Sequence, residues 1–130
     1  MIENIWSIVC ADIITDNRTN LVSYINCLEE LSVPKLPVVV PLISVGTLWE
    51  KSDEDDNLTI KVNLESPAGS KKELFKSESL KMEKKRHRVN VEIGGLTFEE
   101  TGIYNFIIEY LNKKEWKVAK KIPIHIKKIG

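Results

Sequence analysis

Few side chains in this sequence could combine to catalyse a reaction. His87 and His125 are its only histidines; the first lies in the basic stretch 85–88, and the second lies near the lysines at the C-terminus. A hydrolytic triad needs a nucleophile beside a base, and a structural zinc site needs four thiolate or imidazole ligands. Neither set can be assembled around these histidines, so we expect no catalytic residue, no metal and no enzymatic activity.

Two other segments have the composition of a ligand site but not its pattern. Residues 53–56 are all acidic, yet they lack the alternating ligands and the central glycine of a calcium-binding loop. Gly94 and Gly95 form an isolated pair rather than a phosphate-binding loop, and we expect them to close a strand that ends at Ile93. The sequence therefore predicts no cofactor, and a solvated loop at 53–56.

The cysteines and the apolar runs indicate the compartment. Cys10 and Cys27 are the only cysteines, which is too few for a secreted disulfide scaffold, so we expect two buried free thiols. The first residues lack the basic start and apolar stretch of a signal peptide, and no apolar run approaches the ~20 residues that span a bilayer. These observations predict a cytoplasmic protein without a membrane partner.

Charge is unevenly distributed along the chain, although the formal net charge is zero. Residues 1–56 hold ten acidic and three basic side chains, a net charge of −7, whereas residues 57–130 hold nine acidic and sixteen basic ones, a net charge of +7. A neutral total argues against a dedicated nucleic-acid binder. Two basic stretches, 81–88 and 113–121, leave an electrostatic binder of nucleic acid or another polyanion as the alternative function.

Alternation of apolar and polar residues with a period of two dominates the sequence. This pattern is typical of strands that have one buried and one wet face, and no segment shows a comparable helical period. Together with the turn signals, it predicts strands near residues 4–14, 20–28, 37–50, 58–65, 71–77, 86–93, 103–111 and 116–127. About eight short strands with few helices indicate a sandwich or a barrel.

Proline and turn residues refine this arrangement. Pro41 and Pro123 cannot donate a ladder hydrogen bond, so we expect edge or irregular structure in the first half of the third strand and in the middle of the last. Residues 112–115 are polar and separate the last two strands, which we expect to form a hairpin.

One motif is more specific than alternation. Residues 91–106 follow the pattern V-x-I-x-x-L-x-x-x-E-x-G-x-Y-x-F. This spacing resembles the run through two consecutive strands of immunoglobulin-like domains, where an acid, a glycine and a tyrosine form a tyrosine corner. The resemblance implies that Gly102 permits a sharp turn, that the Tyr104 hydroxyl bonds back to the main chain, and that Glu100 helps to fix the turn.

The resemblance implies an all-β, immunoglobulin-like antiparallel sandwich of about seven or eight strands, formed as one domain by residues 1–130. The second cysteine of that family would fall at Phe106, so its inter-sheet disulfide cannot form. Trp49 lies too far beyond Cys27 to be assigned as the family's core tryptophan. The chain also resembles uncharacterised bacterial proteins built as lone domains of this type, at Ala11-Asp12, Leu36-Pro37, Pro67-Ala68-Gly69 and Gly102-Ile103-Tyr104.

Domains of this type without catalytic residues act as recognition or assembly modules. We therefore predict a non-enzymatic module that binds a protein, which could be a second copy of the chain. The expected contact surfaces are the edge strand 116–127 and the loop 51–57. Tryptophan is enriched at binding hot spots, although core packing is an equal alternative for these tryptophans. The candidate contact residues are Trp6, Trp116, Lys113 and Lys114.

Overall fold

The computed structural model describes residues 2–52 and 57–129, and these residues form strands and no helix. The strands are β1 (Ile2–Thr15), β2 (Val22–Cys27), β3 (Glu30–Val33), β4 (Val38–Lys51), β5 (Asn57–Leu58), β6 (Ile60–Glu65), β7 (Lys71–Lys76), β8 (Leu80–Lys81), β9 (Arg86–Phe98), β10 (Gly102–Asn112) and β11 (Glu115–Lys128). The predicted all-β fold is confirmed. The sequence analysis misses β3, β5 and β8, because two to four residues are too few for a period-two pattern.

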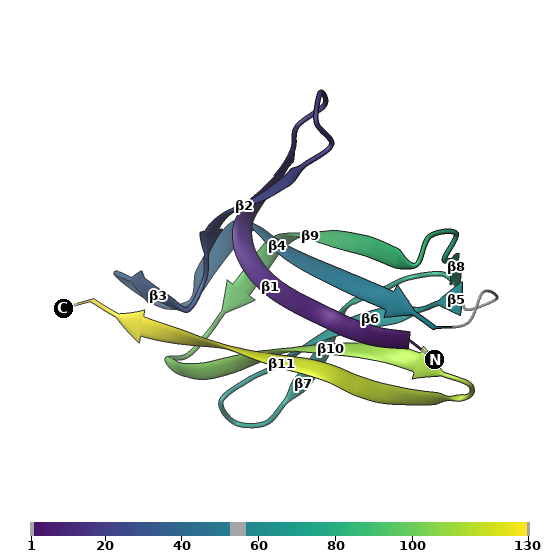
Figure 1. The fold of residues 1–130 in the computed structure, drawn as a ribbon. Coiled ribbons are helices and arrows are strands. Elements are labelled where there is room, and N and C mark those ends of the chain that lie inside the picture. Colours follow the sequence, from purple (N-terminus) through teal and green to yellow (C-terminus); the bar gives the residue numbers. More distant parts are fainter. Residues whose placement is uncertain (1, 53–56, 130) are drawn as a thin grey trace.

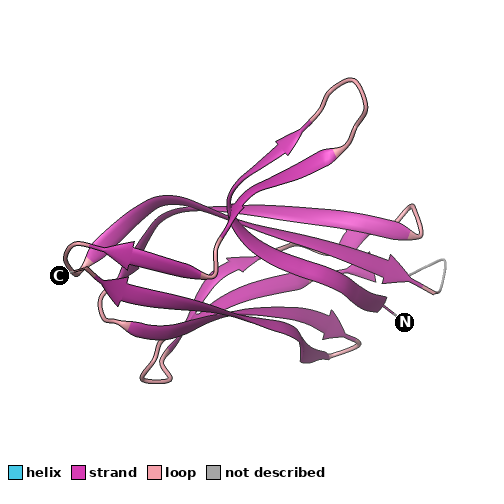
Figure 2. Cartoon of the chain, turned by 60° about the vertical axis from the view of Figure 1, so that its left-hand side comes forward, coloured by secondary structure: helices cyan, strands magenta, loops and turns pink. Residues whose placement is uncertain are grey.

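The strands form two sheets that pack face to face as a β-sandwich (Figures 1 and 2). The β1 sheet has the order β2-β1-β4-β9, and the β10 sheet has the order β3-β11-β10-β6-β7. A short two-stranded sheet, β5-β8, accompanies them. All pairs within these sheets are antiparallel except β3 with β11, which is parallel.

The apolar faces of the two sheets enclose the core, as the alternation predicts. Val45, Val91 and Phe106 are among its buried members. Trp49 is also fully buried, with an exposed fraction of 0%, and it packs against Tyr110 at a ring distance of 5.7 Å. Trp49 is therefore a core tryptophan, although its spacing from Cys27 gave no reason to place it there.

The glycine pair does not end a strand, which corrects the prediction of a turn after Ile93. Strand β9 continues to Phe98 and stays paired with β4 throughout. Gly95 has a φ of 65° and lies opposite Pro41, between the pairs Val40–Leu96 and Leu42–Gly94. Because glycine accepts positive φ at little cost, the strand can kink here without leaving the sheet.

The kink reverses which side chains face the core. Before it, the buried residues of β9 are Val91 and Ile93, at odd positions; after it they are Leu96 and Phe98, at even positions. Strand β4 reverses at the same rung, since Ile43 is buried whereas Val38 and Val40 pack against the core. In both strands the core-facing side chains therefore switch between odd and even positions at the same rung, and the register between β4 and β9 is preserved.

A hairpin projects from the sandwich, as Figures 1 and 2 show. Strand β1 pairs with β4 only as far as Cys10 and then continues into the hairpin with β2. We call residues 12–25, which comprise the end of β1, the turn and most of β2, the arm. Because β1 leaves, the first half of β4 pairs with β9 alone among the described strands, and it is an edge as Pro41 predicts.

The last strand is an edge over only part of its length, which corrects the expectation for 116–127. Residues 125–128 of β11 pair with β3, whose Glu30 forms a 2.8 Å ion pair with Lys127. Residues 115–124 pair with β10 alone, and Pro123 lies within this free part. The predicted hairpin of the last two strands is present, with Lys113 at its turn in a positive-φ conformation.

The turn between β9 and β10 is built around Tyr104. Its hydroxyl accepts a hydrogen bond from the main-chain N–H of Glu100 at 3.2 Å and donates one to the Glu100 carbonyl at 3.1 Å. Both bonds are made by the main chain of Glu100. Gly102 has a φ of 128°, and a Cβ there would lie 2.8 Å from a Pro67 carbon.

Candidate binding site

The arm begins at an aromatic cluster on the outer face of the β1 sheet. The ring of Tyr24 lies on Gly46 so closely that a Cβ at Gly46 would be 2.3 Å from its Cε1 atom. Trp6 meets Tyr24 edge to face at a centroid distance of 5.1 Å. The Tyr24 hydroxyl is 3.5 Å from the Asn90 side-chain oxygen, and burial raises the pKa of this hydroxyl. The cluster therefore joins β1, β2, β4 and β9.

Beyond this cluster the arm exposes apolar side chains. Ile14 is 48% exposed, Leu21 is 68% exposed and Ile25 is 37% exposed. The carboxylate of Asp16 accepts hydrogen bonds from the main-chain N–H groups of Arg18 and Thr19, which orders the turn. A two-stranded hairpin is marginally stable in water by itself, so the arm depends on the aromatic cluster at its base for support.

Trp116 lies on the other sheet, within a lysine cluster. The Nζ atom of Lys61 is 4.2 Å from the centre of its ring, and the Nζ atom of Lys76 is 5.7 Å away. Lys113 and Lys114 are exposed at the adjacent hairpin turn. The four predicted contact residues therefore lie on two different sheets. Trp6 belongs to the aromatic cluster at the start of the arm, and the other three lie at one end of the β10 sheet.

The two basic stretches are separated, because β9 and β11 belong to different sheets. The first stretch borders a hollow of about 470 Å³ beside the start of β9. The residues that line it are Leu48, Lys81, Glu83, Lys84, Arg86, His87 and Arg88. Cationic groups predominate in this hollow, so it favours anionic groups.

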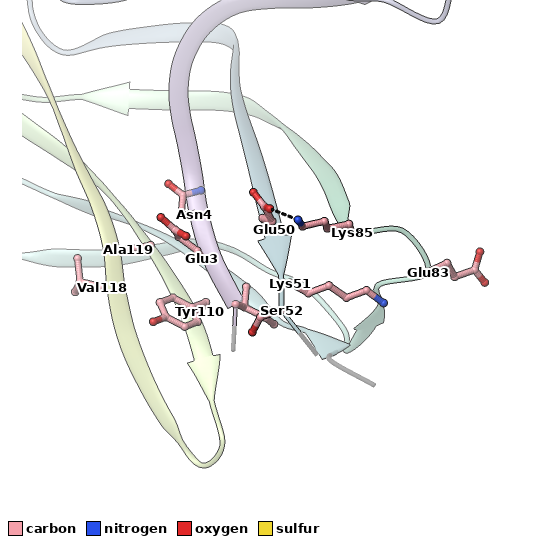
Figure 3. Close-up of a pocket in the computed structure, with 11 residues that line it drawn as sticks. Glu3, Asn4, Glu50, Lys51, Ser52, Glu83, Lys85, Tyr110, Val118 and Ala119 are labelled. Carbon is pink, nitrogen blue, oxygen red and sulfur yellow. Dashed lines mark ion pairs between the residues drawn. The ribbon is translucent and has the colours of Figure 1, made fainter. Parts of the chain in front are cut away.

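A larger cavity, of about 1140 Å³, opens where β1 begins and β4 ends (Figure 3). Its lining combines Glu3, Glu50 and Glu83 with Lys85 and Tyr110, among others. An ion pair of 3.2 Å joins Lys85 to Glu50 on its wall. Neither a histidine nor a cysteine is among the described residues that line it.

The prediction of two buried thiols is correct for one cysteine only. Cys10 is buried as expected, but Cys27 is exposed, because β2 is the outermost strand of its sheet. Residues 53–56 of the predicted contact loop lie outside the described residues. Within residues 2–52 and 57–129, no three His, Cys, Asp or Glu side chains group as metal ligands.

The arm is not among the predicted features. The pattern predicts a strand at 20–28, and the polar run 16–20 before it is a signal for a hairpin turn. Nothing in the sequence signals that the hairpin leaves the sheet, since that depends on where β1 stops pairing with β4. Ile14, Leu21 and Tyr24 are consequently absent from the predicted contact residues.

The fold and these surfaces define a β-sandwich domain with a projecting hairpin. Comparison with protein families places the chain: it belongs to DUF6941, a family of unknown function whose model matches residues 6–127. No curated protein matches the sequence. In the described residues there is no helix with the length and apolar character needed to cross a membrane.

Proposed function

We propose that the protein is a non-enzymatic binding or assembly module that contacts a protein partner through the arm. The observation that carries this proposal is the exposure of Ile14 and Leu21 on a hairpin that extends beyond the sandwich. Burying large apolar side chains contributes about 1.5–3 kcal/mol each, so a partner that covers both would gain appreciably.

The composition of the arm's base supports the proposal. Binding hot spots are enriched in tryptophan, tyrosine and arginine. Trp6 and Tyr24 contact each other there, and the charge of Arg88 acts on the Tyr24 hydroxyl. Trp6 is half-buried, so it retains surface for a partner while its position is fixed by packing.

We further propose an immunoglobulin-like relationship and a cytoplasmic, bacterial setting. The Tyr104 corner, and a sheet order that pairs β4 with β9 and places β6, β10 and β11 together, support the relationship. Two free cysteines are consistent with a reducing compartment. In such domains partners bind at loops or strand edges, and the arm supplies both.

Site-specific photocrosslinking in the native cells tests the proposal. A photoreactive amino acid replaces Leu21 on the arm, and in a matched control it replaces Glu73, which is exposed on β7 of the other sheet. We expect one discrete protein adduct at position 21, absent at position 73 and lost when Ile14→Ser is added. Equal or absent adducts at the two positions would refute the arm as the contact surface.

Light scattering of the purified protein distinguishes a second copy from another partner. If the chain binds itself, its apparent mass rises with concentration, and Leu21→Ser abolishes the increase. A monomer at all concentrations, unchanged by salt, excludes the self-assembly version and leaves the crosslinked partner to be identified by mass spectrometry.

The lysine cluster at Trp116 favours a second candidate function, the binding of a polyanion. Lys61 and Lys76 come from separate strands and converge on one aromatic ring, which is a combination used to bind nucleic-acid strands.

A salt titration of binding tests this candidate. Binding of single- and double-stranded DNA and RNA should weaken steeply as the salt concentration rises. Lys61→Glu should reduce it, whereas Lys35→Glu, an exposed lysine elsewhere, should not. Salt-insensitive or absent binding would eliminate this candidate.

A further inference from the structure

The two cysteines lie directly opposite each other at the base of the arm. Cys10 of β1 pairs with Cys27 of β2 in the antiparallel register. The next pair towards the sandwich is bonded, since the Leu28 N–H donates to the Val9 carbonyl at 2.8 Å. Hydrogen-bonded and non-bonded pairs alternate along an antiparallel ladder, so Cys10 and Cys27 occupy a non-bonded pair.

This position suits a disulfide. In non-bonded pairs the Cα atoms are about 4.5 Å apart and the two side chains share one face of the sheet. Disulfides span Cα separations of about 4.4–6.8 Å. Both thiols are free, and the Cys10 S–H donates only a weak hydrogen bond, 3.3 Å long, to the Asp12 carbonyl.

The two thiols differ in accessibility, which sets the order in which they would react. Cys27 is exposed, whereas Cys10 has an exposed fraction of 0%. Burial, and next the nearby Cys27, raise the pKa of the Cys10 thiol. Cys27 is therefore the thiol that meets a dissolved oxidant, and Cys10 is the thiol that resolves the product.

We propose that Cys10 and Cys27 form a reversible disulfide by exchange with glutathione disulfide. The Cys27 thiolate attacks one sulfur of glutathione disulfide, forms a mixed disulfide and expels one glutathione thiolate. The Cys10 thiolate then attacks the Cys27 sulfur and expels the second. The two protons of the protein thiols pass to the departing thiolates, so two cysteines are oxidised and one glutathione disulfide is reduced to two glutathiones.

The bond would lie where the arm leaves the sandwich. Cys10 is the last residue of β1 that pairs with β4, and the turn of the arm lies between the two cysteines in sequence. A covalent link at this rung would hold β1 and β2 together at the root of the arm and restrict its opening. The inference depends on the strand register and not on the proposed protein partner, so either can fail without the other.

Intact mass measurement after incubation in glutathione redox buffers tests the inference. We expect the wild-type mass to fall by two hydrogen atoms, both free thiols to be lost and the change to reverse with reductant. Arg18 lies between the cysteines, so a non-reducing tryptic digest should contain peptides 1–18 and 19–35 joined. Cys10→Ser should retain glutathione on Cys27, and Cys27→Ser should stay unmodified.

Other outcomes would overturn the inference. They are a wild-type protein that keeps a stable glutathione adduct, one that forms only disulfide-linked dimers through Cys27, and one that keeps both thiols in oxidising buffer. As a check on folding, both serine variants should show the β-sheet circular dichroism of the reduced wild type, so that loss of the bond is not loss of structure.

Discussion

The indole N–H of Trp49 donates a 2.8 Å hydrogen bond to the hydroxyl of Thr47, two residues earlier on β4. Thr47 in turn donates a 2.7 Å hydrogen bond to the Val89 carbonyl of β9. Both side chains are fully buried. One hydroxyl thus satisfies the only polar group of the core tryptophan and also ties two strands together.

Replacing this hydroxyl should destabilise the sandwich. Thr47→Val keeps the side-chain shape but leaves the buried indole N–H without an acceptor, and we expect a loss of about 2 kcal/mol in the free energy of unfolding. Urea denaturation followed by tryptophan fluorescence measures it. Thr97→Val, at an exposed position of β9, is the matched control and should change stability little. Equal effects of the two changes would contradict this role.

The hydrogen bonds of the Tyr104 corner should contribute a similar amount to the free energy of unfolding. Tyr104→Phe removes both hydrogen bonds to the Glu100 main chain while the ring stays packed against Phe98, and we expect a loss of about 1–2 kcal/mol. Tyr24→Phe removes a half-buried hydroxyl that lies 3.5 Å from the Asn90 side-chain oxygen and also interacts with Arg88, and it should cost less. Thermal unfolding of the two variants gives the comparison; if Tyr104→Phe is the milder one, the corner is not stabilising.

The contact of Tyr24 with Gly46 predicts a specific effect on the arm. Gly46→Ala places a methyl group within the Tyr24 ring, so the ring has to move and the base of the arm should loosen at a cost of about 1–3 kcal/mol. Limited trypsin cleavage at Arg18 and the fluorescence of Trp6 should report the change.

Gly94→Ala is the matched control for that experiment. A Cβ at Gly94 meets nothing closer than 3.7 Å, the distance to the Pro41 carbonyl oxygen, so this variant should leave cleavage of the arm unchanged. Similar cleavage rates for Gly46→Ala and the wild type would show that Tyr24 does not anchor the arm.

The ion pair between β3 and β11 predicts a pH dependence. The hydrogen bond from Lys127, followed by its charge, lowers the pKa of the Glu30 carboxyl below its ordinary value of 4.5. A lowered folded-state pKa means that the pair contributes stability above the unfolded pKa and loses it as the pH falls through the folded one. NMR titration should give a Glu30 pKa that rises in Lys127→Ala; an unchanged pKa would exclude this cause.

Local patterns predict most of the sandwich. The strands at 58–65 and 103–111 follow from alternation, because every second side chain of each faces the core, although Ile107 on the opposite face of β10 is buried as well. These properties depend on residues near one another in the sequence.

The features that sequence analysis misses depend on pairing between distant segments. Gly94 and Gly95 resemble a turn until Pro41 is placed opposite them. Cys27 has apolar neighbours in the sequence as Cys10 has, yet it is exposed because β2 is the outermost strand of its sheet. The arm, and with it the exposure of Leu21, exists only because β1 stops pairing with β4 at Cys10.

The kink at Pro41 and Gly95 constrains where residues can be inserted into or deleted from β4 and β9. Deleting Gly95 alone would place Leu96 and Phe98 two and four residues after Ile93, as in a regular strand, but it would leave Pro41 of β4 without an opposite residue. A compensating deletion in β4 would restore the pairing register of the two strands. Insertions and deletions at this rung are therefore tolerable only in matched pairs, one on each strand.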